Sequence, residues 1–142
     1  MGGGAIGFSR VTRTYIDSGV LIAAIRGSSD LSTRCLAVLL EPDRTFVSSA
    51  FLRLELLPKA AYHRNAEEIA FHEWFFGRVS AWATVDDALI GEAEQIAREF
   101  GLNALDALHV ASAIRTHAEE LVTTEAIRKP IHRVTAVSIL TV

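Results

Sequence analysis

Short apolar segments with β-propensity alternate along the chain with segments whose apolar residues recur at helical spacing. We expect strands at residues 14–16, 45–47, 82–85, 121–123 and 134–142. Strands that are separated by helices need crossover connections, which are typical of parallel sheets with helices on both faces. The pattern therefore predicts a single α/β domain built around a parallel sheet of five strands.

Helices fill the intervals between these strands, and several have recognisable ends. Pro58 is expected to bend the helix that contains it, because proline removes a backbone hydrogen bond. Asp86 or Asp87 caps a helix that ends at Gly101, and Asn103 opens the next one. The expected helices cover residues 32–40, 50–63, 65–76, 86–101 and 103–114.

The composition is that of one folded domain. The chain has 142 residues, half of them hydrophobic, and its mean hydropathy is +0.27. We assign residues 13–142 to the domain and the glycine-rich residues 1–12 to a flexible leader. No apolar run is long enough to cross a bilayer, and the lone Cys35 cannot form an internal disulfide. We therefore expect a cytoplasmic protein that has no membrane segment.

Four acidic residues fall where strands end or near the start of helices. Asp17 ends the first strand, Glu55 lies in the helix after the second, and Asp106 lies in the first turn of the helix before the fourth. Glu125 follows the fourth strand. Because open α/β sheets bind their ligands at the carboxyl ends of the strands, we expect these four carboxylates to share one edge of the sheet.

Such a group of carboxylates predicts a magnesium site. Mg²⁺ prefers hard oxygen ligands, and like charges raise one another's pKa until a cation neutralises them. The sequence has neither paired cysteines nor the histidine spacings of zinc sites. A metal held there could orient a phosphodiester and activate water. The net charge of −3 argues against a dedicated nucleic-acid binder, but not against an enzyme that meets nucleic acid through metal ions.

Each acid also has a simpler, structural interpretation. Asp17 could be a turn residue, Asp106 fits a capping box with Asn103, and Glu125 resembles a surface residue near a helix start. Glu55 is the hardest to explain structurally, because leucines flank it on both sides. The interpretation as a metal site therefore depends on the four acids as a set.

The remaining charged and histidine side chains are expected to be structural. We predict that the acidic pairs at 67–68 and 119–120 lie on solvated helix faces. His109 follows Asp106 by about one helical turn, and we interpret it as a partly buried packing residue rather than a ligand. Basic residues such as Arg26 and Lys59 could touch phosphates.

In four segments the sequence resembles the PIN-domain nucleases, and within them the VapC-type toxins of toxin–antitoxin pairs. The segments keep the family's order, spacing and context from about residue 13 to the end of the chain, and each contains one of the four acids. One such motif is a weak signal, whereas four in order are fairly specific. The segments are Tyr15–Ile22, Val47–Leu57, Leu105–Ala113 and Leu121–Glu125.

The resemblance implies a three-layer α/β/α PIN-like fold and cleavage of RNA that depends on Mg²⁺ or Mn²⁺. It implies that Asp17, Glu55 and Asp106 bind the metal and that Ser18 supports the first of them. The fourth acid of the family is usually aspartate, whereas this sequence has Glu125. Its extra methylene moves the carboxylate, so we expect Glu125 either to bind through water or only to support the site.

Further members and partners of the site follow from the same resemblance. Asn103 and Thr124 neighbour the third and fourth acids and are expected to support them. The implied partners are an RNA substrate and an antitoxin whose C-terminal segment covers the acidic groove. A homodimer formed through apolar helices is also implied.

Other α/β families with acidic magnesium pockets match less well. A phosphoacceptor receiver domain would need adjacent acids after the first strand, and a haloacid-dehalogenase-type phosphatase would need Asp-x-Asp. The sequence has Asp17-Ser18-Gly19 at this place. Two alternatives stay open, a non-catalytic PIN-like module that binds RNA or protein and a housekeeping nuclease that processes RNA.

Overall fold

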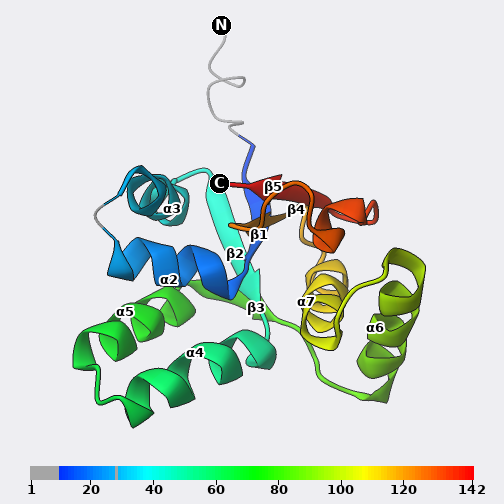
Figure 1. Ribbon diagram of the computed structural model, residues 1–142, viewed down its shortest axis with the longest axis horizontal. Coiled ribbons are helices and arrows are strands. Elements are labelled where there is room, and N and C mark those ends of the chain that lie inside the picture. The colour runs from blue at the N-terminus through cyan, green and yellow to red at the C-terminus, as the bar shows by residue number, and fades with distance from the viewer. Residues whose placement is uncertain (1–9, 28) are drawn as a thin grey trace, which may run out of the picture.

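Five strands form one parallel sheet in the part of the chain that the structure describes, residues 10–27 and 29–142. They are β1 (Thr12–Ile16), β2 (Arg44–Ser48), β3 (Val79–Trp82), β4 (Glu120–Thr123) and β5 (Ser138–Thr141). The computed structural model orders them β3-β2-β1-β4-β5 (Figure 1). Most of the predicted leader, residues 1–12, lies outside the described residues, and β1 begins at Thr12.

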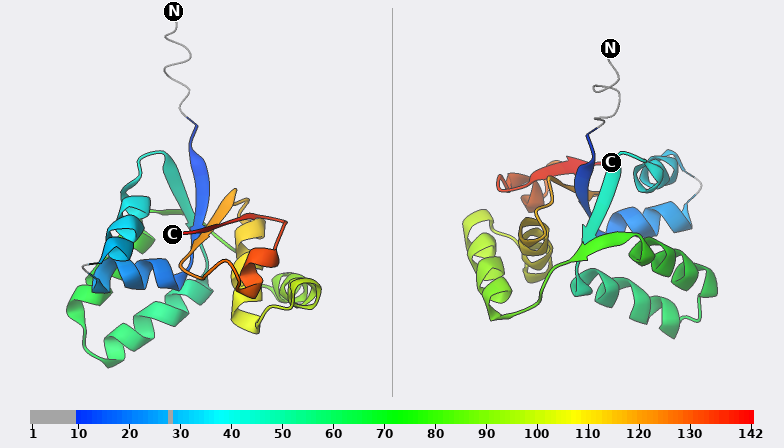
Figure 2. Two further views of the ribbon diagram at one scale, coloured as in Figure 1. Left: turned by 45° about the horizontal axis from the view of Figure 1, so that its top comes forward. Right: turned by 180° about the vertical axis from the view of Figure 1, so that it is seen from behind.

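Helices cover both faces of this sheet (Figures 1 and 2). On one face lie α2 (Ser18–Arg26), α3 (Asp30–Leu40), α4 (Ala50–Tyr62) and α5 (Ala66–Gly77). On the other lie α6 (Asp87–Phe100) and α7 (Ala104–Arg115), and a short 3-10 helix, η1 (Pro130–Arg133), precedes β5. The helix that contains Pro58 continues through it to Tyr62.

Alternation along the central strands builds two separate cores. Tyr15 and Leu121 are buried against α6 and α7, whereas their neighbours Ile16 and Val122 are buried with α2, α3, α4 and α5. Successive side chains of a strand point to opposite faces, so each central strand contributes to both cores. This arrangement confirms the predicted three-layer α/β/α fold with a five-stranded parallel sheet.

The third strand was predicted at the wrong residues. The expected segment, 82–85, overlaps β3 only at Trp82, because α5 ends at Gly77 and Arg78 turns the chain directly into the strand. The Arg78 guanidinium donates to the carbonyl of Leu39 and stacks on the Phe46 ring, which fixes this turn. β3 is an edge strand with alternate residues exposed, so its apolar signal is weaker than that of the segment after it.

The fifth strand is shorter than expected. Residues 134–142 were predicted to form it, but β5 begins only at Ser138 and ends at Thr141. Val134 and Val137 are buried in the core beside α6 and α7, yet they lie in a loop after η1. Burial of valines in an irregular segment produced the same apolar signal as a strand.

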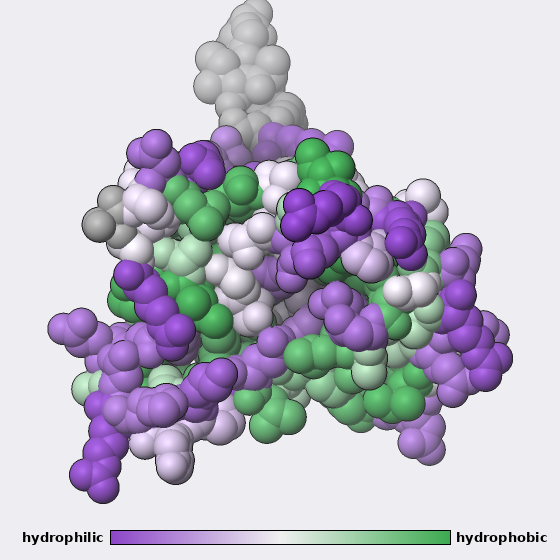
Figure 3. Space-filling view, in the orientation of Figure 1, coloured by the Kyte–Doolittle hydropathy of each residue, from purple (hydrophilic) through white to green (hydrophobic). Residues whose placement is uncertain are grey.

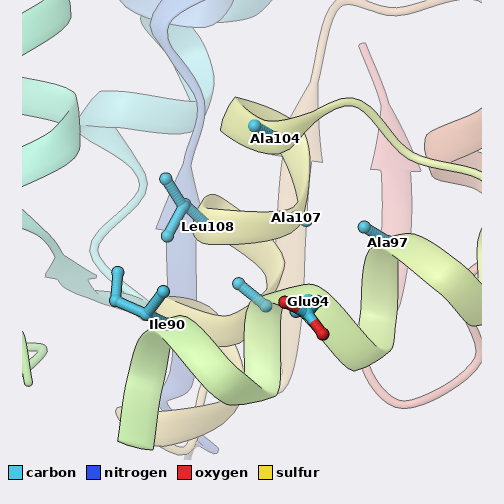
Figure 4. Close-up of a pocket in the computed structure, with 7 residues that line it drawn as sticks. Ile90, Glu94, Ala97, Ala104, Ala107 and Leu108 are labelled. Atoms are coloured by element: carbon cyan, nitrogen blue, oxygen red, sulfur yellow. The ribbon is translucent and has the colours of Figure 1, made fainter. Parts of the chain in front are cut away.

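The surface of the described residues carries an apolar depression on the side of α6 and α7. The face in Figure 3 mixes hydrophobic and hydrophilic residues without one dominant apolar patch. An apolar depression of about 330 Å³ lies between α6 and α7, where Ile90, Ala97 and Leu108 line it beside a single charged residue, Glu94 (Figure 4). None of the described helices has the length and hydropathy needed to cross a membrane.

The topology points to the carboxyl end of β1. From β1 the chain builds outward through β2 to β3, and it then returns to the opposite side of β1 to form β4 and β5. The strand order therefore reverses at β1, and such a switch point is where open α/β sheets bind ligands. Asp17 is the first residue after β1, and its N–H donates to the Val122 carbonyl of β4 at 3.1 Å.

Candidate active site

Asp17 is held in place by both neighbouring elements. It is the N-cap of α2, and its Oδ1 accepts a hydrogen bond from the N–H of Val20 at 3.2 Å. The Thr123 hydroxyl at the end of β4 donates to Oδ2 at 2.5 Å. Burial nevertheless raises the pKa of Asp17 to about 6, and the charge of Glu125 adds to this rise. The carboxylate is thus fixed in position but costly to ionise without a cation.

Gly19 allows the chain to pass close to the loop after β4. A Cβ atom at this position would lie 2.3 Å from Oγ1 of Thr124 and 3.4 Å from Oδ1 of Asp17. The side chain of Thr124 therefore packs against the first turn of α2. Asp17 could have been a simple turn residue. In the structure it is the N-cap of α2, and the first turn of this helix is tightly packed at Gly19.

Glu55 projects from α4 to the same edge. Its Oε2 accepts a hydrogen bond from the Ser18 hydroxyl at 3.1 Å, and its Oε1 contacts Nε2 of His109. Burial alone would raise the pKa of Glu55, but the hydrogen bond and charge of His109 and the Ser18 hydroxyl together hold it below its ordinary value. The pKa of Glu55 is therefore lowered, whereas those of Asp17 and Asp106 are raised.

His109 is hydrogen-bonded to the buried hydroxyl group of Tyr15, and this group is hydrogen-bonded to the buried hydroxyl of Ser49. The Tyr15 hydroxyl lies 2.6 Å from Nδ1 of His109 and 2.6 Å from Oγ of Ser49. Burial, helped by the charge of Glu55, raises the pKa of Tyr15, so its hydroxyl stays protonated. Nδ1 of His109 thus faces the Tyr15 hydroxyl, and its Nε2 faces the Glu55 carboxylate. Ser49, Tyr15 and His109 thus form a chain that orients Glu55.

Asp106 lies in the first turn of α7 and takes part in a capping box. Its N–H donates to Oδ1 of Asn103 at 2.9 Å, and Nδ2 of Asn103 donates back to its Oδ2 at 3.2 Å. Burial and the charge of Glu125, followed by that of Glu55, raise the pKa of Asp106. The structural interpretation of Asp106 is therefore correct, and the same residue is charge-coupled to the other acids.

Glu125 is exposed in the loop after β4. Its N–H donates to Oγ1 of Thr123 at 3.0 Å, and its carbonyl accepts from Nε2 of His132 at 2.9 Å and from the Thr141 hydroxyl at 2.8 Å. These contacts hold the backbone of the loop, and among the described residues the Glu125 carboxylate forms neither a hydrogen bond nor an ion pair. Its charge contributes to the raised pKa values of both Asp17 and Asp106.

The sequence pattern of one known family extends over most of this fold. The family model of the PIN domain matches residues 14–128. The chain belongs to the PIN domain family. The match covers all four segments that carry the acids, so the resemblance noted in the sequence is confirmed at the level of the family.

Solved structures share the fold of this PIN domain at low sequence identity. VapBC2 from Rickettsia felis, bound to a DNA fragment from its promoter, matches with a TM-score of 0.68 and 18% identity over 92% of this chain and 98% of that chain. A toxin–antitoxin complex from Klebsiella pneumoniae matches with a TM-score of 0.67 and 16% identity, over 90% of this chain and 96% of that chain. VapBC-1 from nontypeable Haemophilus influenzae matches with a TM-score of 0.67 and 18% identity, over 92% of this chain and 98% of that chain. No curated protein sequence matches this chain significantly.

The donors in this PIN domain fit a divalent cation chemically. Within residues 10–27 and 29–142, no three acidic, histidine or cysteine side chains are close enough to form a ready-made metal-binding group. The carboxylates are nevertheless coupled through their charges, and each carboxylate oxygen has lone pairs beyond those used by its hydrogen bonds. A hard cation would offset both causes of the raised pKa values of Asp17 and Asp106, the burial of their charges and the smaller repulsion from Glu125.

Several residues at this edge were not found from the sequence. Thr124 was expected to support the site, yet its neighbour Thr123 is the residue that contacts Asp17. His109 was interpreted as a packing residue, and it is buried, but it also contacts Glu55. The register of β4 against β1 decides which threonine faces Asp17, and the sequence carries no signal for that register.

The prediction of solvated helix faces was wrong for two glutamates. Glu68 is buried in α5, where Arg26 pairs with it, and Glu120 is the buried first residue of β4, where Arg44 pairs with it at 2.8 Å. In both cases the partner is far away along the chain. A pair of adjacent glutamates therefore resembled a solvated surface in the sequence although one member of each pair is internal.

Proposed function

We propose that this PIN domain is an endoribonuclease that depends on Mg²⁺ or Mn²⁺ and serves as the toxin of a toxin–antitoxin pair. One observation carries the proposal: acids from four distant segments are charge-coupled at the switch point of the sheet. In the described part of the chain, no arginine or lysine forms an ion pair with Asp17, Asp106 or Glu125. Uncompensated carboxylates of this kind favour a metal centre over a structural ion-pair network.

In this proposal Asp17, Glu55 and Asp106 hold the cation, and Glu125 reaches it through water or supports the site. A divalent cation bound there would activate water and stabilise charge on the phosphate. Water adds to phosphorus as the bond to the 3′ oxygen breaks, which leaves a 3′ hydroxyl and a 5′ phosphate. The choice of bond rests on the resemblance to the VapC-type toxins.

The protein's own residues fix the carboxylates in advance. Thr123 and the N-terminus of α2 hold Asp17, and Asn103 holds Asp106. Ser18 and His109 orient Glu55 and keep it ionised. Preorganised acids of this kind lower the reorganisation needed when substrate and cation bind.

The proposed partner is an antitoxin protein. Three solved relatives of this fold are described as VapBC or toxin–antitoxin complexes. An acidic edge attracts a basic side chain for the same reason that it attracts a metal ion. We further propose that the toxin acts in the cytoplasm and pairs with a second copy through apolar helices.

The decisive assay measures RNA cleavage by the wild type and by Asp17→Asn with Mg²⁺, Mn²⁺ or EDTA. Asp43→Asn is the matched control, because it removes an exposed carboxylate in the turn before β2. We expect the wild type and the control to cleave RNA only with added metal, and Asp17→Asn to be inactive. Cleavage by Asp17→Asn at the wild-type rate would refute the assignment.

A second candidate function is a non-catalytic RNA-binding or interaction module. Two observations favour it, the lack of a ready-made metal-binding group in the described residues and the glutamate at position 125. Such a module would bind RNA equally well in EDTA and would not cleave it with any metal. The same assay, extended by an RNA-binding measurement in EDTA, separates the two functions.

A further inference from the structure

Most basic side chains of this protein are already engaged within the chain, but a few are not. The sequence has 14 lysines and arginines, and all of them lie in the described residues. Most donate to a carboxylate or to a backbone carbonyl. The basic side chains without such a partner among the described residues are Arg34, Lys59, Arg64, Arg128 and Lys129, and all of them are exposed. In a chain with a net charge of −3, these are the cations that remain for a ligand.

Lys59 lies beside the acidic edge on the side of α4. It follows Glu55 by four residues, so it is on the same face of the helix and about 6 Å further along the axis. Ser18, Glu55 and Lys59 line the same polar pocket. Glu55 would be the natural partner of Lys59, but Ser18 and His109 hold its carboxylate instead. Lys59 is therefore a cation next to the acids that none of the described residues neutralises.

Arg128 and Lys129 lie in a closed turn that follows Glu125 directly. The N–H of Lys129 donates to the carbonyl of Ala126 at 2.9 Å, and two hydrogen bonds to the Glu125 carbonyl anchor the start of the turn. Consecutive Cα atoms are about 3.8 Å apart, so the Cα of Arg128 lies within about 11 Å of that of Glu125. A turn that is already held in this way loses little backbone freedom when its side chains bind a ligand.

These two basic positions lie on opposite sides of Asp17. β2, which leads into α4, and β4, which leads into the turn, pair with opposite sides of β1 (Figure 1). Asp17 is the first residue after β1. A chain of negative charges that passes over Asp17 from the α4 side to the β4 side therefore meets unpaired cations before and after the acids.

The occupant that matches this pattern is a phosphodiester chain. Charges interact over about 10 Å at 0.1 M salt, so the acids alone would repel phosphates next to the edge. The flanking cations act over the same range and offset that repulsion. An acidic protein segment also carries negative charge, but only a phosphodiester chain uses the proposed metal between the two basic positions as well as the cations beside it.

We infer that Lys59 on one side, and Arg128 with Lys129 on the other, bind the RNA phosphates that flank the scissile one. The inference rests on the proposed ribonuclease function, because it takes the acidic edge as the place where the RNA is cut. It adds a path for the strand, from α4 across the end of β1 to the loop after β4. Phosphate contacts position a nucleic acid without reading its sequence, so these residues contribute affinity for RNA of any sequence.

The first test measures the binding of a fluorescent single-stranded RNA in EDTA at about 50 to about 200 mM KCl. For single strands, each phosphate contact contributes about 0.7 to the slope of log K against log salt. We expect Lys59→Ala to reduce the slope by about 0.7 and Arg128→Ala/Lys129→Ala to reduce it by about 1.4.

The matched control removes two unpaired charges that lie elsewhere. Arg34→Ala changes an exposed position of α3, and Arg64→Asn changes the residue after the far end of α4, where asparagine tolerates the positive φ. The double variant Arg34→Ala/Arg64→Asn should keep the wild-type slope. An equal loss of slope in this control, or an unchanged slope in Arg128→Ala/Lys129→Ala, would overturn the inference.

An acidic partner protein is the competing ligand for the same cations. A polyglutamate peptide in the same titration represents it. We expect Arg128→Ala/Lys129→Ala to weaken the binding of RNA more than that of the peptide. Loss of peptide binding with wild-type RNA binding would assign these cations to a protein partner and overturn the inference.

The second test measures kcat and KM for RNA cleavage with Mg²⁺. Contacts to flanking phosphates are made in the ground state as well as in the transition state, so their loss raises KM more than it lowers kcat. We expect Arg128→Ala/Lys129→Ala to raise KM roughly tenfold and the control to match the wild type. A fall in kcat at unchanged KM would contradict the inference. If the wild type cleaves nothing, the proposed function fails, and the salt titration in EDTA still decides whether these cations bind RNA.

Discussion

The two ends of the sheet differ in whether their acidic residues form ion pairs with arginines. At the amino end, Glu120 accepts from Nε of Arg44 at 2.8 Å and from the Thr14 hydroxyl at 2.7 Å, and the half-buried Glu119 pairs with Arg10. These carboxylates are neutralised within the chain. Because their charges are already balanced, they have a structural explanation and need no ligand.

At the carboxyl end of the sheet, three of the four acids have no arginine or lysine partner among the described residues. Asp17 and Asp106 have raised pKa values, with burial as the largest cause, and Glu125 adds repulsion to both. No arginine or lysine pairs with these three in the described residues. The comparison teaches that a count of acids does not single out a candidate site, whereas acids without internal counter-charges do.

The largest expected effect is on catalysis at the carboxyl end. Asp106→Asn should lower the initial rate of Mg²⁺-dependent RNA cleavage by roughly 100-fold or more, since losing one cation contact removes several kcal/mol of transition-state stabilisation. Glu120→Gln at the other end should stay close to the wild-type rate at a temperature where it is folded. Equal losses in both variants would remove the distinction between the two ends.

The close packing at Gly19 predicts the next effect. In Gly19→Ala the new methyl would overlap with Oγ1 of Thr124, so the first turn of α2 and Asp17 must shift. We expect a loss of about 1–3 kcal/mol in the free energy of unfolding together with a clear loss of RNA cleavage.

Two further variants test the cause. Thr124→Ala in the Gly19→Ala background removes the overlapping hydroxyl and should restore part of both losses. Gly91→Ala, in α6 with nothing within 4 Å of the new methyl, should instead stabilise the protein slightly. A Gly19→Ala variant as stable and active as the wild type would show that the packing is looser than described.

The amino end predicts a loss of stability without a loss of chemistry. Glu120→Gln leaves the guanidinium of the half-buried Arg44 without its carboxylate. We expect urea denaturation at pH 7.5 to give a free energy of unfolding lower by about 2 kcal/mol, a discounted value because the pair is only partly buried. No measurable change would mean that Thr14 and solvent replace the ion pair.

The smallest expected effect has the opposite sign. The pKa of Asp17 is about 6 in the folded protein and about 3.9 when unfolded. The folded state therefore binds the proton more tightly, and this contribution to stability is lost as the pH rises from about 4 to about 6. In EDTA, Asp17→Asn should therefore gain on the order of 1–2 kcal/mol relative to the wild type at pH 7.5, and little near pH 4. Urea denaturation at both values measures this, and a difference independent of pH would contradict it.

Much of the fold could be predicted from local patterns. β1, β2 and β4 lie in the middle of the sheet, and their apolar runs gave their positions to within a few residues. β3 and β5 lie at the edges, where one face is exposed and the apolar signal is weak. The prediction therefore misplaced β3 and made β5 too long, because the apolar residues of the neighbouring loops resembled a strand more than the edge strands did.

The positions of the candidate acids in the fold could be predicted, but the residues that contact them could not. Asp17 and Asp106 could be placed because strand ends and helix starts can be recognised along the chain. Thr123 and His109 act across the sheet or between helices, so their roles depend on register and packing. The partnership of Glu120 with Arg44 has the same origin, since only the pairing of β4, β1 and β2 brings the two together.

Thermal unfolding of the wild type, Asp106→Asn and Glu120→Gln over a range of Mg²⁺ concentrations tests the central claim most directly. A ligand that binds the folded state raises the melting temperature as its concentration rises. We predict that Mg²⁺ raises the melting temperature of the wild type and of Glu120→Gln, but not that of Asp106→Asn. An equal rise in Asp106→Asn, or no rise in the wild type, would contradict a cation site at the carboxyl end of the sheet.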